Sequence, residues 1–373
     1  MESMGLEAME QSAEQSVEQS LLAWIQQSLA QHADITCAEQ IQLSSLRGDA
    51  GFRQYFRLNT QPSLLAVCAP KTEGNSESAS YFATCAVALR KQGVPTPQVI
   101  AVDEQQNFLL IEDFGEQAFL DVLSAESADL LYSEALMVLL RLQQISETEI
   151  DLPHYDRNML RQEMSLFSEW FVSQLLDYQL NDAERQLLDE TFRFLEEQAL
   201  SQPKVVVHKD YHSRNLIYRE GEAPGVIDFQ DAVLGPITYD VVSLLKDCYI
   251  HWSPEQVKRW LITYGNLAIE LGVIPPVSEA QWLKWFDTMG LQRHIKVLGI
   301  FSRLSIRDGK SGYLDDMPLV WHYVTEAAGN FPETMAFSYW CQETLLPLVK
   351  QQSWYREITS DDQVTDHKKV SPL

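Results

Sequence analysis

Cysteine is scarce in this sequence, and the cysteines present are not paired. Five cysteines occur in 373 residues, and no two of them form a C-x-x-C pair. Because the cysteines are also odd in number and widely spaced, the sequence indicates neither a disulfide framework nor a zinc site. We expect the cysteines to act as small buried hydrophobic residues.

Positive charge is also in short supply. The sequence has 28 Lys and Arg residues against 53 Asp and Glu residues, which gives a formal net charge of -25. Proteins that bind nucleic acid neutralise the phosphate backbone with clustered Lys and Arg. The charge balance therefore argues against a nucleic-acid partner.

Long apolar runs and a targeting segment are missing as well. No stretch approaches the roughly 18 consecutive apolar residues that a membrane-spanning helix needs. Residues 1–20 are rich in Glu, Gln and Ser and contain neither the basic start nor the apolar centre of a signal peptide. We therefore predict a cytoplasmic protein with no membrane partner.

What remains is the composition of a globular protein, with 45% hydrophobic and 22% charged residues. A chain of this length can form two lobes. We predict a polar tail over 1–19, a nucleotide-binding lobe over 20–115, a catalytic and acceptor-binding lobe over 116–350, and a polar tail over 351–373.

The first lobe is predicted to combine strands with helices. Apolar spacing indicates the helices, and alternating polar and apolar residues indicate the strands. The expected elements are a helix over 21–31, a hairpin over 41–60, a strand over 63–70, a helix over 78–93, and strands over 97–103 and 107–115.

From residue 116 onward the apolar period becomes helical. Helices are predicted over 128–145, 157–176 and 182–200, and further helical segments reach residue 350. Strands interrupt this pattern only within 205–228. The second lobe should therefore be larger and mainly helical.

The segment VVVHKDYHSRNLIY at 205–218 interrupts an apolar strand with a dense polar loop. Its residues His208, Asp210 and Asn215 form the pattern H-x-D-x-x-x-x-N, and Asp228 follows in VIDF. Phosphoryl transfer needs a carboxylate that accepts the proton of the acceptor hydroxyl. It also needs an amide oxygen and a second carboxylate that hold Mg²⁺. Asp210 fits the first role, and Asn215 with Asp228 fits the second.

These motifs resemble those of the protein-kinase-like superfamily and, within it, the aminoglycoside phosphotransferase family. The resemblance covers roughly residues 40–320. It implies an α+β, two-lobed fold, with ATP and Mg²⁺ as cofactors and His208 beside the catalytic Asp210. It also implies that Asp240 braces the catalytic loop, although Asp240 could instead be only a helix N-cap.

The nucleotide side of the pattern is less regular. The family's phosphate-covering loop corresponds to RGDAGFRQYFRL, where Gly48 and Gly51 could present backbone N–H groups to phosphates. An ordinary hairpin turn would explain these glycines equally well. The third strand, SLLAVCAP, lacks the family's lysine, so Arg53, Arg57 or Lys71 would have to meet the phosphates.

The segment LLIEDFG occupies the position of the hinge between the lobes. The resemblance implies that backbone groups of Glu112, Asp113 and Phe114 bind adenine. A strand end followed by Phe-Gly is also ordinary loop chemistry, so this assignment depends on its place between the lobes.

A second group of residues bears on the acceptor. Basic residues gather over 285–318, namely Arg293, His294, Lys296, Arg303, Arg307 and Lys310. A charged face exposed to solvent is the alternative explanation. With the catalytic loop, this stretch resembles the bacterial N-acetylmuramate/N-acetylglucosamine anomeric kinases of cell-wall recycling. The resemblance implies a small sugar as partner. The expected substrate contacts are His212, Arg214, Arg303 and Arg307, with arginine facing a sugar carboxylate.

Three other functions stay open at this point. An aminoglycoside kinase would need an acidic surface for its polycationic acceptor, against which the basic cluster argues. A kinase of a choline-like alcohol would need an aromatic cage, and the nine Trp residues leave this open. A kinase-like binding module would explain the missing lysine. The oligomeric state is not predicted.

Overall fold

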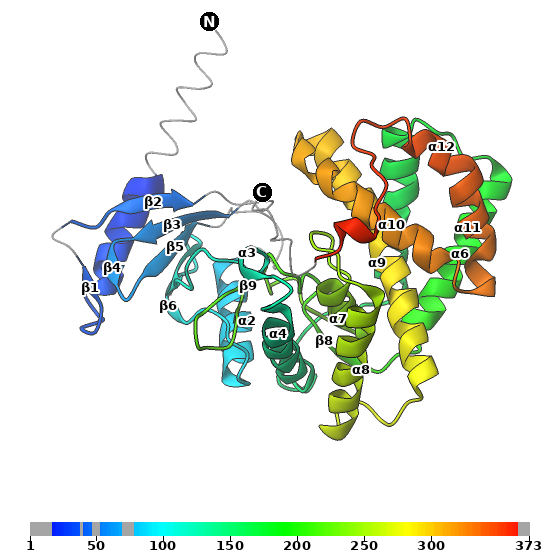
Figure 1. Cartoon of the computed structure of the whole chain (residues 1–373). Coiled ribbons are helices and arrows are strands. Elements are labelled where there is room, and N and C mark those ends of the chain that lie inside the picture. Colours follow the sequence, from blue (N-terminus) through cyan, green and yellow to red (C-terminus); the bar gives the residue numbers. More distant parts are fainter. Residues whose placement is uncertain (1–16, 38–39, 47–52, 69–77, 365–373) are drawn as a thin grey trace, which may run out of the picture. The chain divides into compact units, whose positions relative to one another are not determined.

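The computed structural model describes residues 17–37, 40–46, 53–68 and 78–364 (Figure 1). The chain forms two compact units. The first runs to Glu116 and also contains Gly225–Gln230, and the second contains the remaining residues from Gln117 onward. As predicted, the first unit is rich in strands and the second is mainly helical.

The first unit is built on a five-stranded antiparallel sheet with the order β2-β3-β5-β7-β6. Each predicted strand is present. The strands are β2 (Leu43–Leu46), β3 (Gln54–Leu58), β5 (Leu64–Cys68), β6 (Val99–Asp103) and β7 (Phe108–Glu112), with a short pair formed by β1 (Thr36–Cys37) and β4 (Thr60–Gln61). The predicted hairpin turn with Gly48 and Gly51 and the candidate cation Lys71 lie outside the described residues.

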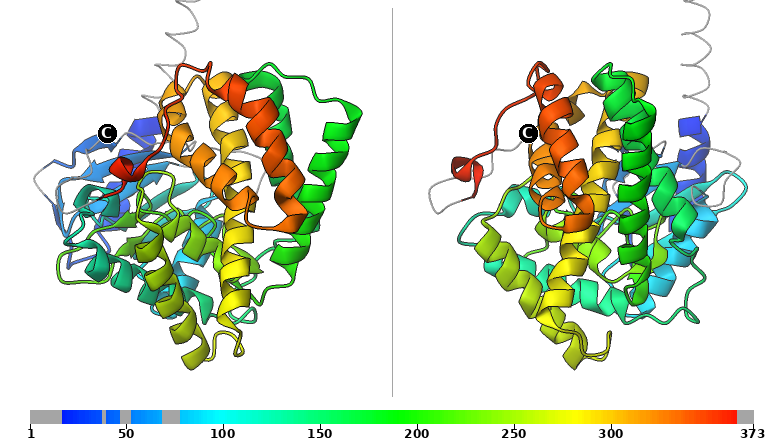
Figure 2. Two further views of the ribbon diagram at one scale, coloured as in Figure 1. Left: turned by 45° about the vertical axis from the view of Figure 1, so that its right-hand side comes forward. Right: turned by 90° about the vertical axis from the view of Figure 1, so that its right-hand side faces the viewer.

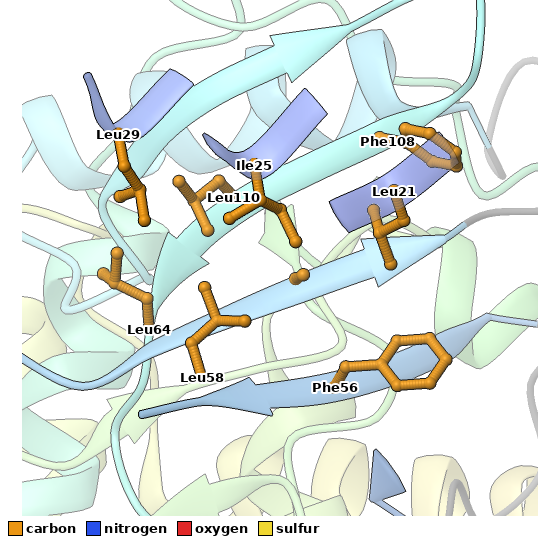
Figure 3. Packing of buried hydrophobic residues seen from close by; sticks show 9 residues of the cluster. Leu21, Ile25, Leu29, Phe56, Leu58, Leu64, Phe108 and Leu110 are labelled. Atoms are coloured by element: carbon orange, nitrogen blue, oxygen red, sulfur yellow. The ribbon is translucent and has the colours of Figure 1, made fainter. Parts of the chain in front are cut away.

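Helices flank this sheet. Residues 17–29 form a helix whose Leu21, Ile25 and Leu29 are spaced four apart and are all buried. Figure 3 shows them packed against sheet residues that include Leu58 and Leu110. The second helix is α2 (Ala79–Lys91), which Ser78 caps by accepting a hydrogen bond from the Tyr81 N–H. Both predicted helices of this unit are therefore confirmed.

The segment Gly225–Gln230 also packs within the first unit. The Val226 N–H donates to the Pro95 carbonyl at 2.7 Å, and the Phe229 and Phe82 rings lie 4.8 Å apart. A Cβ on Gly225 would lie 2.4 Å from the Phe114 ring, so only glycine fits at this position. These contacts fix the segment that carries Asp228.

The second unit consists mainly of helices around α9, which runs through its middle (Figure 2). Two short strands follow the catalytic segment in the chain: β9 (Leu216–Ile217), which belongs to the second unit, and β10 (Gly225–Val226), which belongs to the first. The main helices are α3 (Phe119–Val122), α4 (Ala128–Gln143), α5 (Arg157–Leu166), α6 (Asp182–Leu200), α7 (Thr238–Leu245), α8 (Pro254–Glu270), α9 (Glu279–Asp308), α10 (Met317–Ala328), α11 (Met335–Trp340) and α12 (Leu346–Val349). Short segments of other helix types are η3 (Ser311–Asp316), η4 (Pro332–Thr334), η5 (Cys341–Leu345) and η6 (Ser360–Asp362).

Two features of this unit differ from the sequence prediction. The helix predicted over 157–176 changes to a π-helix over η2 (Phe167–Leu175). In η2, Phe167 and Phe171 are fully buried, and their ring centres stack 5.3 Å apart. The strand β11 (Val233–Pro236) was not predicted. It pairs with β8 (Lys204–Val207) and completes a two-stranded sheet before the catalytic segment.

The cysteines match the expectation in part. Cys85, Cys248 and Cys341 are buried, but Cys37 is exposed on the two-residue strand β1, and none of the five is in a disulfide. Among the described residues, no helix has the length and apolar character needed to cross a membrane.

Candidate active site

The catalytic segment begins where β8 ends, and a buried carboxylate holds its backbone. Asp240 lies in the first turn of α7 and is fully buried. Its two oxygens accept hydrogen bonds from the N–H groups of His208, at 2.7 Å, and Lys209, at 3.0 Å. Ile237, rather than Asp240, is the N-cap residue of α7. Asp240 therefore binds the loop instead of capping its own helix.

The loop then turns back on itself around Asp210. Lys209 has a left-handed backbone with φ of 76°. The Asp210 N–H donates to Nδ1 of His208 at 3.3 Å, and the Asp210 carbonyl accepts from Nδ2 of Asn215 at 3.0 Å. Because this bond uses the amide nitrogen of Asn215, it orients the amide so that Oδ1 is the atom left for a ligand.

Asp210 itself is partly exposed. Burial alone would raise the pKa of its carboxyl group, but the positive charge of Lys296, followed by His212, His208 and Arg293, brings that pKa below its usual value. Asp210 is therefore ionised at neutral pH. An ionised carboxylate beside a solvent-accessible surface can accept and orient a hydroxyl group.

A second buried carboxylate holds the centre of the loop. Asp247 accepts hydrogen bonds from the N–H and the hydroxyl of Ser213, at 2.9 and 2.6 Å. Next to Ser213, the Arg214 guanidinium stacks 3.6 Å above the Tyr249 ring, and one of its nitrogens lies 3.8 Å from Asp316. The His212 ring meets the same Tyr249 edge-on at 5.4 Å. His212 and Arg214 thus share one aromatic surface.

A charged cluster that no sequence pattern indicated lies beside this loop, and we call it the Glu163 cluster. It contains Glu163 of α5, Lys209 of the loop, Lys296 of α9, and the tyrosines Tyr155 and Tyr239. Glu163 pairs with Lys209 at 2.9 Å and with Lys296 at 3.1 Å, and it accepts a hydrogen bond from the Tyr155 hydroxyl. Lys296 also donates to the Tyr239 hydroxyl at 2.9 Å. Only Lys296 carried a signal in the sequence, as a member of the basic stretch.

That basic stretch does not form one solvated face. Arg293, His294 and Lys296 are buried. Arg307 is exposed and pairs with its neighbour Asp308 at 2.7 Å. Arg303 is partly buried, and its Nε has no hydrogen-bond partner within the described part of the chain. The structure therefore separates residues that the sequence grouped together.

In the first unit, the predicted hinge residues already have partners. Arg57 of β3 donates to both oxygens of Asp113, at 2.6 and 3.1 Å, and also pairs with Glu116. The N–H groups of Glu112 and Asp113 donate to the carbonyls of Gln98 and Ser63. These two N–H groups are thus committed to the protein, and their assignment to adenine stays a prediction.

The remaining predicted residues of the first unit are Arg53 and Asp228. The Arg53 guanidinium lies 5.5 Å from the centre of the Phe82 ring. Burial raises the pKa of Tyr55. The positive charge of Arg53 lowers this pKa, and the negative charge of Asp228 raises it. Asp228 is exposed, has a left-handed backbone with φ of 63°, and accepts a hydrogen bond from Gln230 at 2.6 Å. Arg53 and Asp228 therefore both lie near Tyr55.

Comparison with known proteins identifies the family. The model of the phosphotransferase enzyme family matches residues 42–276. The chain belongs to this family. The phosphotransferase is 39% identical to the N-acetylmuramate/N-acetylglucosamine kinase of Pseudomonas aeruginosa, over 80% of this chain and 87% of the relative. It is 37% identical to the protein of the same name from Neisseria meningitidis, over 78% and 87% of the two chains.

Solved structures agree with this family on the fold. An aminoglycoside 2′-phosphotransferase in its GDP complex has a TM-score of 0.54 and 18% identity, covering 83% of the phosphotransferase and 99% of that chain. A choline/ethanolamine kinase family protein from Mesorhizobium loti has a TM-score of 0.55 and 14% identity, covering 79% and 91%. The predicted protein-kinase-like α+β fold, the family and the enzymatic class are confirmed. As a kinase, the phosphotransferase uses a nucleotide.

Proposed function

We propose that this phosphotransferase transfers a phosphoryl group from ATP, with Mg²⁺, to the anomeric hydroxyl of N-acetylmuramate or N-acetylglucosamine. One observation carries the proposal: relatives 37–39% identical, matched over 78–80% of this chain, are N-acetylmuramate/N-acetylglucosamine kinases. The presence of Asp210, Asn215 and Asp228 together supports turnover rather than binding alone.

In this proposal Asp210 accepts the proton of the sugar hydroxyl and orients its oxygen. Asp210 is ionised, and His208 and Asn215 fix its backbone on both sides. Phosphoryl transfer depends mainly on positioning and charge stabilisation, so a carboxylate of low basicity is sufficient. His208 has a positioning role, since its Nδ1 accepts the Asp210 N–H.

Asn215 and Asp228 are the proposed metal ligands. An amide oxygen and a carboxylate are the hard oxygen donors that Mg²⁺ prefers. Asn215 fits because its amide nitrogen is already bonded to Asp210. In the described part of the chain, no three His, Cys, Asp or Glu residues group together to hold a metal by themselves. When bound with the nucleotide, Mg²⁺ offsets phosphate charge during transfer.

For the nucleotide phosphates, the structure favours Arg53 over Arg57. Arg57 is bound to two carboxylates, Asp113 and Glu116, whereas Arg53 has a hydrogen bond with Tyr55, whose pKa the charge of the proposed metal ligand Asp228 also affects. We therefore propose Arg53 as the cation that takes the place of the missing strand lysine. Gly48, Gly51 and Lys71 remain predictions.

For the acceptor, we propose that Arg214 and His212 contact the sugar. Arg214 is the first candidate among the arginines for binding a carboxylate of the sugar. Arg214 lies four residues from Asp210, and the Tyr249 ring fixes the plane of its guanidinium. Arg303 is the second candidate, because its Nε lacks a hydrogen-bond partner among the described residues. Arg307 is the third candidate, since its guanidinium already forms an ion pair with Asp308.

The proposal is tested by measuring ATP turnover against N-acetylmuramate, N-acetylglucosamine, an aminoglycoside and choline. We expect turnover with the two amino sugars only. Turnover with choline or the aminoglycoside alone would replace the acceptor assignment. Absence of turnover with every acceptor would favour a binding module.

The arginine assignment is tested with Arg214→Ala, Arg303→Ala and Arg307→Ala. N-acetylmuramate carries a carboxylate that N-acetylglucosamine lacks. Losing a charge-assisted contact costs about 1.5–3 kcal/mol, so the correct variant should lose roughly ten- to a hundredfold in kcat/KM for the acid sugar. The neutral sugar should lose little. If the ratio of the two sugars stays at the wild-type value in all three variants, these arginines do not bind the carboxylate.

A further inference from the structure

Glu163 joins three separate elements at one carboxylate, and the proposed chemistry does not use it. It lies on α5, Lys209 lies in the catalytic loop, and Lys296 lies on α9. Both ammonium groups bond to the same oxygen, Oε1, while Oε2 accepts from Tyr155. The side chains of Glu163, Lys209 and Lys296 are only 15%, 15% and 10% exposed, so water screens these charges weakly.

Lys209 is the member of the cluster that touches the catalytic machinery. A residue with a Cβ rarely adopts a φ of 76°, and it stays there only when its surroundings hold it. Both ends of Lys209 are held. Its N–H donates to Asp240 at 3.0 Å, and its ammonium group pairs with Glu163 at 2.9 Å.

Rotation about the backbone of Lys209 would swing the next residue, Asp210. The anchor on the Lys209 side chain therefore limits the direction in which the Asp210 carboxylate points. Glu163 also holds Lys296, whose positive charge is the main one that favours the ionised form of Asp210. Without the carboxylate, the ammonium groups of Lys209 and Lys296 would face each other without compensation.

We infer that Glu163 is a positioning residue for phosphoryl transfer, which fixes Lys209 in its left-handed conformation and thereby aims the carboxylate of Asp210 at the acceptor hydroxyl. This inference rests on the proposed function, in which Asp210 receives the acceptor proton. It assigns a role in the reaction to α5, a helix that carries none of the proposed catalytic or metal-binding residues.

The main test is Glu163→Gln, which keeps the size of the side chain and removes its charge. A misplacement of about 1 Å at a reacting group can cost on the order of a hundredfold in rate. We expect kcat to fall roughly ten- to a hundredfold while the KM for ATP stays within about twofold, because nucleotide binding does not depend on the aim of Asp210. A purely structural role would not separate kcat from KM in this way.

The chain offers a matched control in Glu196→Gln. Glu196 of α6 is also a buried glutamate with two cationic partners, and these partners, Arg157 and Arg161, also lie on α5. Among the described residues, Glu196 has no ion pair or hydrogen bond with the catalytic loop, so its loss should lower the melting temperature without changing kcat by more than about twofold. Equal kcat losses in the two variants would overturn the inference.

A double-mutant cycle tests the route through Lys209. Lys209→Met keeps an aliphatic side chain of similar length but removes the ammonium group, which lies 5.7 Å from the centre of the Tyr155 ring. If Glu163 acts through Lys209, the kcat of the double variant should be no lower than that of the less active single variant. Losses that multiply would contradict this route. Should Glu163→Gln fail to fold, Lys209→Met alone must show the same split between kcat and KM, and an unchanged kcat would overturn the inference.

The wild-type enzyme separates this inference from the proposed function. If it phosphorylates no amino sugar, the proposed acceptor is wrong, and the variants are compared by ATP hydrolysis, in which Asp210 would orient water instead. A hydrolysis rate that falls in Glu163→Gln but not in Glu196→Gln would still support the positioning role. Equal hydrolysis rates in all three proteins would overturn it.

Discussion

The catalytic loop carries several charged residues and the strand β3 carries one, Arg57, and the protein holds them differently. Each turn of the loop is bound to a buried carboxylate, because Asp240 holds Lys209 and Asp247 holds Ser213. On β3, Arg57 pairs with Asp113, whose side chain is 3% exposed, and with Glu116, whose side chain is 71% exposed. Polar groups in the interior must be satisfied by specific partners, whereas solvent can replace a partner at the surface. The loop is therefore the more strictly determined of the two.

This difference predicts that single substitutions in the loop have the largest effect. Asp210→Asn removes the charge that accepts the acceptor proton but leaves the backbone bonds to His208 and Asn215. We expect kcat to fall by on the order of 10²–10⁴ with little change in ATP affinity. Steady-state kinetics and calorimetric nucleotide binding measure the two quantities. Near-normal turnover would remove Asp210 from the mechanism.

We expect the next largest effect from a substitution that separates α9 from α5, because the Glu163 cluster requires these two helices to lie close together. A Cβ at Gly299 would lie 2.4 Å from the carbonyl carbon of Leu166, at the end of α5. Because the backbone cannot easily move away, Gly299→Ala should destabilise the protein by about 1–3 kcal/mol and disturb the cluster. Denaturant unfolding measures this change.

Gly290, in the same helix, is the control for Gly299. A Cβ there would meet only Val242, at 3.8 Å. Since alanine favours helix by about 1 kcal/mol over glycine, Gly290→Ala should leave stability unchanged or raise it. If the two variants lose equal stability, a close approach at Gly299 does not determine how α9 packs.

The same contrast explains which parts of the site could be predicted from the sequence. His208, Asp210 and Asn215 lie within eight residues, so their pattern is visible in one segment. Glu163 acts on Lys296, which is 133 positions away, and nothing in the polar surface pattern of its helix distinguishes it. Asp247 likewise looked like an ordinary acidic residue. Partners that are distant in sequence become visible only when packing brings them together.

The fold shows the same limit on a smaller scale. Strands β3, β5, β6 and β7 were predicted because their apolar residues alternate or run continuously, and this pattern is local. The strand β11 has the sequence VLGP, and its Gly and Pro are unfavourable in strands. It forms because it pairs with β8, which is a tertiary contact. The change to the π-helix η2 within the helix predicted over 157–176 is likewise not visible in the local apolar spacing.

In the first unit, Arg53→Ala and Arg57→Ala should have separate effects. If Arg53 meets the phosphates, its loss should raise the KM for ATP about tenfold, close to 1.4 kcal/mol, with little loss of stability. Arg57→Ala leaves the buried Asp113 with only Ser63 and the Gly115 N–H, so it should lower stability more than ATP affinity. Kinetics and thermal unfolding of both variants test this. The opposite pattern would assign the phosphates to Arg57.

The smallest expected effect is a pH dependence that comes from Asp240. Burial raises the pKa of this carboxyl group to about 7, although the N–H groups of His208 and Lys209 oppose the shift. Below pH 7 the protonated carboxyl group accepts these two bonds more weakly, which loosens the loop. Activity should therefore fall several-fold as the pH drops from about 7.5 to 6.

Stability should change in the opposite direction. The folded pKa of Asp240 lies above the unfolded value, so between about pH 4 and 7 the folded state binds more protons than the unfolded state. The Asp240 contribution to the free energy of unfolding then decreases by up to about 1.4 kcal/mol for each pH unit upward. His251 and His294 oppose this slope, because burial lowers their pKa values to about 4 and about 3. The decisive measurement is thus the difference between wild type and Asp240→Asn, which cancels the histidines. If that difference is constant from pH 5 to 8, Asp240 does not titrate in this range and the loop has no acid-sensitive anchor.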